Sequence, residues 1–517
     1  MIILKKLRLE YTLILQSTHA PQQHNAGTTL ITQDKKHLTV LTLVLDQGSH
    51  ASRMAIFSSQ GELLQLTSIE VATEQPQPDH FEQDANELIQ SLQALLQQLD
   101  PKLIPRIQSC GLCTQRSTVV AWHRQTGKAL SPAISWRDLR AQPLINRLET
   151  HAADCQHITG LPLSAHYSAG KIHWLLQNSP EVKQASNEQQ LCIAPLSSFL
   201  LFHLLEERPF VIDHSNAQRS QLFDTQSLDW SEKMLSLFNI NRQLLPQCRP
   251  MIHHYGQLKK SGIPLTAVCG DQNAIIHAYP EFDNNNTLVN IGTGAFVLSR
   301  HPEKTDTEKT RLLRSIVHSR DKHARFVTEG TVNGAGSALD LALESDPCND
   351  IFTQLPEWLT EVTDPPIYIN TVSGLGSPWW CSGGNAHYIN GNTSGQSSRY
   401  VAIIESIVFL IFKNLQQLES PAHNQDSEIL FISGGLSRLD GLCQKLSDLS
   451  QLRIMRFVDA EASARGCALL ARQLTKNSDS SWAPLDVSHI FEPANNIQLC
   501  NRYHQFVGEL HKRCNRH

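Results

Sequence analysis

The sequence lacks the features that would direct it to a membrane or to nucleic acid. Nothing in it approaches the run of about 20 uninterrupted apolar residues that a bilayer-spanning helix needs. Positive charge is not in excess, since 44 Lys and Arg stand against 49 Asp and Glu and the formal net charge is −5. A broad basic field for nucleic acid and a polybasic patch for an anionic membrane are therefore excluded. We expect a soluble protein whose partner is a small molecule.

The 12 cysteines lack the spacing of a four-ligand zinc site. They are scattered singly apart from Cys110-Gly-Leu-Cys113, and no second CxxC pair exists. This distribution predicts a reducing, cytoplasmic context. We interpret Cys110 and Cys113, which flank a predicted strand, as buried small hydrophobic residues rather than a redox pair.

The start of the chain lacks the order of a signal peptide. Lys5, Lys6, Arg8 and Glu10 interrupt its apolar run, where a signal peptide carries its charge before that run. We therefore predict that residues 1–37 form a poorly ordered extension. The whole chain of 517 residues is too long for one ordinary domain, and 40% apolar with 18% charged residues is a globular composition. Two sizeable domains with a cleft between them are expected.

Two similar hairpin patterns stand about 240 residues apart. Residues 38–65 and 287–300 each contain two apolar runs, rich in β-branched residues, around a Gly-containing turn. The segment Asp84–Leu99 has apolar residues at helical spacing, and strands alternate with helices from there onward. The pattern predicts a duplicated α/β architecture. We place the boundary in the polar segment Glu281–Asn286, which gives domains at 38–282 and 283–517.

The turn of the first hairpin contains the parts of a phosphate cradle. Gly48 lets the backbone approach a ligand, Ser49 and Ser52 offer hydroxyls, and Arg53 offers a forked cation. Asp46 at the strand end can hold Mg²⁺ or its water shell. An ordinary hairpin turn also uses Asp, Gly and Ser, so this turn alone leaves both interpretations open.

A set of motifs in a fixed order decides between them. Gly111 with Gln115-Arg116, the turn Thr126-Gly127-Lys128 and Trp136-Arg137-Asp138 resemble motifs of the glycerol kinases and their relatives in the FGGY carbohydrate kinase family. Further matching segments are Thr159–Leu163, Ser168–Leu176, Asn216–Arg219, Leu228–Trp230, Cys269–Asn273, Gly292–Gly294, Thr331–Gly336, Val372–Trp380, Ile432–Leu436 and Glu461–Ala468. The resemblance runs from about Leu43 to the segment Phe491–Pro493.

The resemblance implies a two-domain actin-like ATPase (ribonuclease H-like) fold, duplicated, with an interdomain cleft. The first domain is then expected to bind a polyol or sugar, and the second to bind ATP, with Mg²⁺ as metal. In the family the aspartate that matches Asp271 accepts the proton of the attacking hydroxyl. A weak hydroxyl nucleophile needs such a carboxylate, which contributes roughly 10²–10⁴-fold to the rate, although an isolated strand-end Asp is more often a helix N-cap.

The remaining site residues follow from the same resemblance. The acceptor-binding residues are expected to be Arg116, Ser117, Trp136, His166, Asp271, Gln272 and Phe296. The residues expected around ATP and its phosphates are Gly48, Ser49, His50, Arg53, Gly292, Thr293, Gly294, Gly334, Gly434 and Gly435. Asp46 is the expected metal ligand. The predicted activity is ATP-dependent phosphorylation of a small polyol or sugar, glycerol or a close relative, by a homo-oligomer, a dimer or a tetramer.

Four positions depart from the family pattern. Ser117 replaces the glutamate of an Arg-Glu pair that binds the polyol, and His166 stands where glycerol kinases have a tyrosine. His50 replaces a threonine that faces phosphate, and Leu439 replaces an asparagine that contacts adenine. These departures keep two alternatives open: a ketose or aldose kinase of the same family, and a non-catalytic sugar sensor. A chaperone-like ATPase of the actin-like superfamily would not need the polyol-pocket residues.

Overall fold

The structure of the chain is a computed structural model that describes residues 40–279, 286–300, 307–348, 350–418, 429–458, 461–475 and 482–514. The predicted extension 1–37 and most of the predicted boundary segment Glu281–Asn286 lie outside the described residues. Within the described ranges, no helix is both long enough and apolar enough to cross a membrane.

Strands and helices alternate through the first half of the chain, as predicted. Its strands are β1 Leu41–Gln47, β2 Ala51–Phe57, β3 Leu63–Glu70, β4 Glu74–Gln77, β5 His80–Gln83, β6 Ile107–Thr114, β7 Val119–His123, β8 Ala133–Ile134, β9 Leu191–Pro195, β10 Val211–Asp213, β11 Phe223–Asp224, β12 Asp229–Trp230, β13 Gln247–Arg249, β14 Ile252–Gln257 and β15 Pro264–Gly270. Its helices are α2 Ala85–Gln97, α3 Gln142–Arg147, α4 Ala152–Thr159, α5 Ser168–Asn178, α6 Pro180–Asn187, α7 Leu196–Leu204, α8 His214–Gln218, α9 Glu232–Leu237 and α10 Asp271–Ile275.

The second half continues the alternation with longer helices. Its strands are β16 Asn286–Ile291, β17 Ala295–Ser299, β18 Leu313–Arg320, β19 His323–Val332, β20 Ile367–Ile369, β21 His387–Ile389, β22 Ile429–Ser433, β23 Arg453–Phe457 and β24 Val487–Phe491. Its helices are α11 Thr307–Thr310, α12 Gly336–Ser345, α13 Ile351–Glu361, α14 Gln396–Leu415, α15 Asp440–Ser450, α16 Ala462–Arg472 and α17 Ile497–Cys514.

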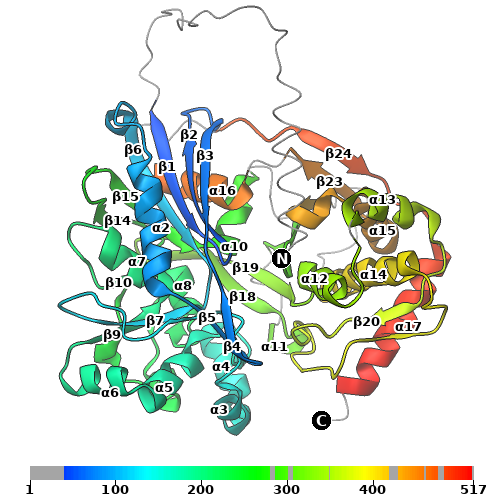
Figure 1. Ribbon diagram of the computed structural model, residues 1–517, viewed down its shortest axis with the longest axis horizontal. Helices are drawn as coiled ribbons and strands as arrows, with labels where there is room; N and C mark the ends of the chain where they lie inside the picture. The colour runs from blue at the N-terminus through cyan, green and yellow to red at the C-terminus, as the bar shows by residue number, and fades with distance from the viewer. Residues whose placement is uncertain are drawn as a thin grey trace, which may run out of the picture.

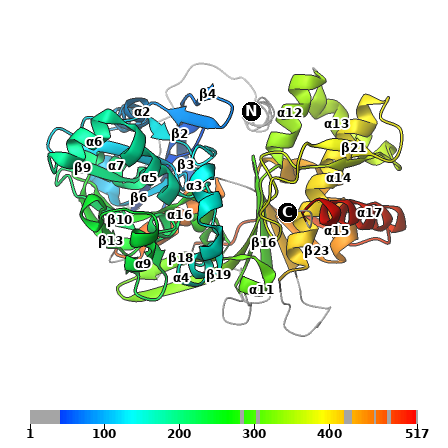
Figure 2. The same ribbon diagram turned by 90° about the horizontal axis from the view of Figure 1, so that it is seen from below.

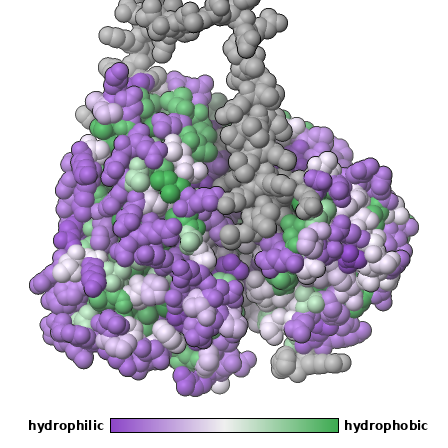
Figure 3. All heavy atoms as spheres, in the orientation of Figure 1, coloured by the Kyte–Doolittle hydropathy of each residue, from purple (hydrophilic) through white to green (hydrophobic). Residues whose placement is uncertain are grey.

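Two lobes lie side by side, one with helices α2–α9 and the other with α12–α15 and α17 (Figures 1 and 2). A 13-stranded sheet runs through both in the order β24-β23-β22-β16-β17-β19-β18-β14-β15-β6-β1-β2-β3. A second sheet, β4-β5-β8-β7-β9, belongs to the first lobe. The face drawn in Figure 3 is mainly hydrophilic where it is coloured, with apolar residues in small separate groups.

The two lobes repeat one pattern of strand pairing. In the first, β1 pairs antiparallel with β2 and parallel with β6, β2 pairs antiparallel with β3, and β6 pairs parallel with β15. In the second, β16, β17, β22, β19 and β23 take the places of β1, β2, β6, β3 and β15 with the same directions. The repetition confirms the predicted duplicated two-domain α/β fold.

Local sequence explains why these elements form where they do. All seven residues of β1, LTLVLDQ, are buried, as expected for an interior strand of a sheet that is covered on both faces. Helix α2 begins after Asp84, whose side chain accepts a hydrogen bond from the backbone N–H of Asn86. Its buried residues, among them Leu88, Leu92 and Leu95, recur at helical spacing and form its core-facing side.

Helix α16 belongs to the first lobe although it lies near the end of the chain. It packs on β1, β6, β15 and α10, and in Figure 1 it lies beside β1–β3. A Cβ on Gly466 would lie 1.9 Å from the carbonyl oxygen of Ala274, so only glycine permits this contact with α10. The Arg465 guanidinium donates to the carbonyl of Gly61 at 2.7 Å. The first lobe therefore depends on a segment from the second half of the sequence.

Seven of the twelve cysteines are buried free thiols, and two form a disulfide. Cys110 and Cys113 lie within β6 and are fully buried, in agreement with their interpretation as small hydrophobic residues. Cys381 and Cys514 form a disulfide across a separation of 133 residues, and the other ten cysteines are free. The scattered spacing did not predict this pair, because a contact between such distant residues leaves no local pattern in the sequence.

Candidate active site

Three parallel strands of the first lobe end at the same edge of the sheet. Asp46 of β1 pairs in register with Cys113 of β6, and Cys113 pairs with Cys269 of β15. The residues that follow β6 and β15 therefore come together near Asp46. These residues are Arg116 and Asp271. Ligand sites of open α/β sheets lie at such carboxyl ends of strands.

The second lobe presents glycine turns at the equivalent edge. In β16 and β22, Asn290 pairs in register with Ser433, so the turns Gly292–Gly294 and Gly434–Gly435 follow neighbouring strands. A Cβ on Gly434, where φ is +90°, would lie 2.5 Å from the carbonyl oxygen of Ile291. A Cβ on Gly294 would lie 2.7 Å from the carbonyl oxygen of Val332. The absence of side chains at these glycines lets phosphate oxygens approach the backbone closely.

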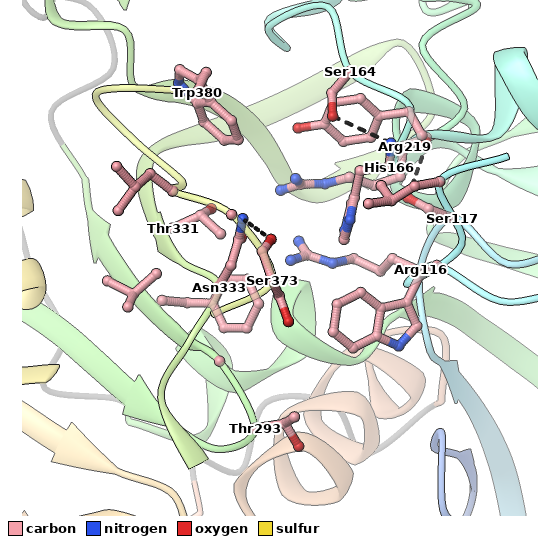
Figure 4. A pocket seen from close by; sticks show the side chains of 18 of the residues that line it. Arg116, Ser117, Ser164, His166, Arg219, Thr293, Thr331, Asn333, Ser373 and Trp380 are labelled. Atoms are coloured by element: carbon pink, nitrogen blue, oxygen red, sulfur yellow. Dashed lines mark hydrogen bonds between the residues drawn. The ribbon is translucent and has the colours of Figure 1, made fainter. Parts of the chain in front are cut away.

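A cavity of about 910 Å³ brings both edges together (Figure 4). The predicted residues that line it are Ser49, Arg116, Ser117, Trp136, His166, Asp271, Gln272, Gly292, Thr293, Gly294 and Phe296. The predicted residues that do not line it are Asp46, Gly48, His50, Arg53, Gly334, Gly434 and Gly435. All the predicted acceptor-binding residues thus share one cavity with the first glycine turn of the second lobe.

Asp271 is the first residue of α10 and lines the cavity with 26% of its side chain exposed. One carboxylate oxygen accepts from the backbone N–H of Gln272 at 2.7 Å and lies 4.0 Å from Nε of Arg116. Burial raises the pKa of Asp271 to about 6, and the charge of Arg116 only partly offsets this effect. A carboxylate with this pKa is ionised at neutral pH and basic enough to accept a proton.

Arg116 connects Asp271 with the walls of the cavity. Its guanidinium donates to Oδ1 of Asn273 at 3.2 Å and to both carboxylate oxygens of Glu329 at 3.2 and 3.3 Å. Its Cζ lies 5.2 Å from the ring centroid of Phe296. The guanidinium is therefore fixed in orientation, with its Nε side toward Asp271.

Trp136 connects the acceptor wall to the turn of the first hairpin. Its indole N–H donates to Oγ of Ser49 at 2.9 Å. On the other side, its ring meets the ring of His166 edge to face, with centroids 5.1 Å apart. The hairpin turn that was predicted to cradle phosphate is thus held directly against the predicted acceptor site.

Two of the four residues that depart from the family pattern, Ser117 and His166, have no charge to offer a ligand. The hydroxyl of Ser117 donates to the backbone carbonyl of Arg219 at 3.1 Å. Burial, with the charges of Lys171 and Arg116 adding to it, lowers the pKa of His166 to about 3, so its imidazole is neutral. The Lys171 ammonium donates to the backbone carbonyls of Ser117 and His166 at 3.2 and 2.8 Å and holds both positions in place.

Asp46 suits a cation on one of its two oxygens. Its Oδ2 accepts from the guanidinium of Arg53 at 2.9 Å. Its Oδ1 is buried and has no hydrogen-bond partner among the described residues. A metal-bound water would satisfy this oxygen, and Mg²⁺ is commonly held by one or two carboxylates together with substrate phosphates. Arg53 faces Asp46 and lies 3.7 Å from the carboxylate of Glu461, so its charge is already paired in this structure.

The cavity is also lined by residues that were not among the predicted site residues, and Tyr167, Arg219, Asn290 and Thr331 belong to this group. Arg219 belongs to a matched motif, which was the available signal, but the motif does not show that its side chain reaches the cavity. Asn290 donates from its amide to Oε1 of Gln272 at 2.9 Å and so joins the two lobes beside Asp271. Such contacts depend on how the lobes meet, which the sequence pattern does not show.

Comparison with known proteins agrees with this geometry. Residues 41–289 match the N-terminal domain, and residues 287–473 the C-terminal domain, of the FGGY family of carbohydrate kinases. The chain belongs to this family. The FGGY kinase is 29% identical over 467 residues to a glycerol kinase of Acinetobacter baylyi, covering 87% of the chain and 94% of the relative. It is 27% identical over 468 residues to a glycerol kinase of Borreliella burgdorferi, covering 87% and 93%.

A solved structure shows the same architecture. The crystal structure of Plasmodium falciparum glycerol kinase with ADP superposes on the FGGY kinase with a TM-score of 0.79 at 25% identity, and it covers 92% of this chain and 98% of the other. The FGGY kinase is therefore an ATP-dependent carbohydrate kinase, and the predicted enzyme class is confirmed.

Proposed function

We propose that this kinase transfers the γ-phosphoryl group of ATP to a hydroxyl of a small polyol, with glycerol or a close relative as acceptor. The observation that carries the proposal is the position of Asp271, which shares one cavity with Arg116 and with the Gly292–Gly294 turn. The relatives named glycerol kinase support glycerol as the acceptor. In this proposal residues 38–282 bind the acceptor and supply the base, and residues 283–517 bind ATP.

Most of the predicted site residues have a part in the proposed reaction. Asp271 accepts the proton of the attacking hydroxyl, and Arg116 orients the acceptor beside it. Trp136 and Phe296 cover the carbon backbone of the acceptor, and Gln272 binds one of its oxygens. The glycine turns hold the phosphates of ATP, and Ser49 faces the transferring group. Mg²⁺, held near Asp46, would neutralise charge on the phosphates. Approach of the two lobes would exclude water as a competing acceptor.

The test is an assay of ADP release across a panel of acceptors. We expect turnover with glycerol or another small polyol that depends on both the acceptor and Mg²⁺. ATP binding without turnover for every acceptor would contradict the proposal and would favour a non-catalytic sugar sensor.

One observation favours a second candidate, a ketose or aldose kinase. Ser117 and His166 offer a hydroxyl and a neutral imidazole, whereas the family's polyol site has a carboxylate and a phenol at these positions. A carboxylate accepts from two hydroxyls of a polyol, and a serine whose hydroxyl is bound to the carbonyl of Arg219 does not replace it. Comparing kcat/KM for glycerol, erythritol, ribulose and xylulose separates the candidates. Ser117→Glu is expected to increase the preference for glycerol.

We further propose that the kinase acts in the cytoplasm as a homo-oligomer, a dimer or a tetramer. Ten of the twelve cysteines are free and one pair, Cys381–Cys514, is bonded, and this predominance of free thiols supports a reducing compartment. Sedimentation of the purified chain at several concentrations would show its oligomeric state, and a monomer at all concentrations would contradict this part of the proposal.

A further inference from the structure

Glu329 is a buried carboxylate that no step of the proposed reaction uses. It lies on β19, in the middle of the large sheet, and its side chain is 1% exposed. Both of its oxygens are occupied: they accept from Arg116 at 3.2 and 3.3 Å, from Ser315 at 2.8 Å, and from Arg219 in a close ion pair. Glu329 does not line the cavity and therefore acts through the residues it binds.

The two arginines reach Glu329 from the first half of the chain. Arg116 follows β6 and Arg219 follows α8, and both line the cavity. Figure 4 shows their side chains directed into the same space. Burial opposes ionisation of Glu329, but the two guanidiniums outweigh it and lower the pKa of Glu329 to about 2. The carboxylate is thus ionised at neutral pH and neutralises part of the charge of two cations that would otherwise repel each other.

Arg116 lies near a second carboxylate, that of Asp271, and Glu329 competes with it for the guanidinium. Its Nε lies 4.0 Å from Asp271, while its two terminal nitrogens bind Glu329. Without the charge of Glu329, Asp271 is the nearest carboxylate to Arg116, and a direct ion pair between them would occupy the oxygen that must receive the proton. A buried guanidinium that has lost its partner moves toward another charge because isolation in the interior is costly.

We propose that Glu329 is a positioning residue: it holds Arg116 and Arg219 side by side on the acceptor cavity and keeps the 4.0 Å contact of Arg116 with Asp271 from closing to a hydrogen-bonded ion pair. The inference rests on the proposed function, in which Asp271 is the base and Arg116 binds the acceptor. It also makes the arrangement of the acceptor site dependent on contact between the two halves of the chain, because β19 follows the predicted domain boundary.

The test is Glu329→Gln, which preserves shape and removes charge. We expect kcat/KM for the acceptor to fall about 100-fold, as for a displaced catalytic group, with KM for ATP unchanged. Glu329→Asp, which restores the charge on a shorter side chain, is expected to recover part of the loss. A folded Glu329→Gln variant with wild-type kcat/KM for the acceptor, or equal rises in both KM values, would overturn the inference.

The chain provides a matched control in Glu405. This residue is also 1% exposed, and it also binds two cations, Lys445 at 3.0 Å and Arg502 at 2.8 Å, but it does not line the cavity. Glu405→Gln is expected to lower the melting temperature while leaving kcat/KM and both KM values at wild-type levels; the same acceptor-specific loss in this variant would overturn the inference. If Glu329→Gln does not fold, Glu329→Asp carries the test, and an unchanged acceptor kcat/KM in that variant contradicts the inference.

Failure of the inference and failure of the proposed function give different results. A wild-type enzyme that releases no ADP with any acceptor contradicts the proposed function. An active wild-type enzyme whose Glu329 variants keep their acceptor kinetics contradicts only the role of Glu329.

Discussion

In the first lobe, the strands β1, β6 and β15 bring Asp46, Arg116 and Asp271 to one edge of the sheet. In the second lobe, the equivalent strands β16 and β22 are followed by the glycine turns Gly292–Gly294 and Gly434–Gly435. The strand pairing is the same in both lobes. Charged side chains occupy one edge and bare backbone the other. One folding pattern thus supplies two kinds of chemistry, because the residues after a strand can change without altering the hydrogen bonds within the sheet.

The difference corresponds to what phosphoryl transfer requires. A hydroxyl acceptor needs a proton acceptor and an oriented hydrogen-bond donor, which Asp271 and Arg116 of the first lobe provide in this cavity. Phosphate oxygens are held well by backbone N–H groups that a Cβ would block. The following predictions test whether the two edges have these separate roles.

The largest effect is expected from Asp271→Asn. The amide cannot accept the proton, so kcat should fall roughly 10²–10⁴-fold while the acceptor still binds. Burial raises the pKa of Asp271 to about 6, so the folded state favours the protonated carboxyl over the ionised carboxylate. The stability that the protonated carboxyl contributes is lost as the pH rises through that value. The melting temperature at neutral pH is therefore expected not to fall. Single-turnover kinetics and acceptor titrations check both points; unchanged kcat would remove Asp271 as the base.

A second prediction concerns α16, which joins the second half of the chain to the first lobe. Gly466→Ala places a methyl group against the carbonyl of Ala274 in α10 and is expected to lower the free energy of unfolding by about 1–3 kcal/mol. Gly508→Ala in α17 is the matched control. Nothing lies within 4 Å of its Cβ position, so alanine there should stabilise the helix by up to about 1 kcal/mol. Chemical denaturation measures both, and equal effects at the two sites would contradict the close contact of α16.

The glycine turns allow steric and ligand effects to be separated. Gly434→Ala is strained at φ +90° and is expected to cost about 1–3 kcal/mol of stability and to raise KM for ATP. At Gly292 the nearest atom to a new Cβ is 3.9 Å away, so Gly292→Ala should keep its melting temperature and still raise KM for ATP, because the methyl group takes space in the cavity. Unchanged KM for ATP in both variants would show that this edge does not hold the nucleotide.

The smallest effect is expected from lowering the pH, which should reduce kcat/KM for the acceptor. Since the pKa of Asp271 is raised to about 6, its proton-accepting form is lost below that pH. At pH 5, one unit lower, kcat/KM for the acceptor should be about tenfold below its plateau. The profile is measured in a buffer series with saturating ATP. The acid limb should be absent from the residual activity of Asp271→Asn, and a limb that persists there belongs to another group.

Much of the fold could be predicted from local patterns. The two hairpins, the helix predicted at Asp84–Leu99 and observed as Ala85–Gln97, and the alternation of strands with helices follow from apolar periodicity and turn residues. The packing of α16 on the first lobe could not be predicted from the sequence. The reason for a glycine at position 466 is its close contact with α10, and that contact exists only in the folded chain.

For the candidate site, the sequence by itself determined which groups are available: the carboxylate of Asp271, the guanidinium of Arg116, and glycines after β16 and β22. Only the tertiary structure decided which of them face one ligand, which are already paired like Arg53, and which, like Glu329, act on their neighbours. The physical reason is that charge and burial act through space. Whether a carboxylate accepts a proton or holds two arginines depends on cations that come from strands far away in the chain.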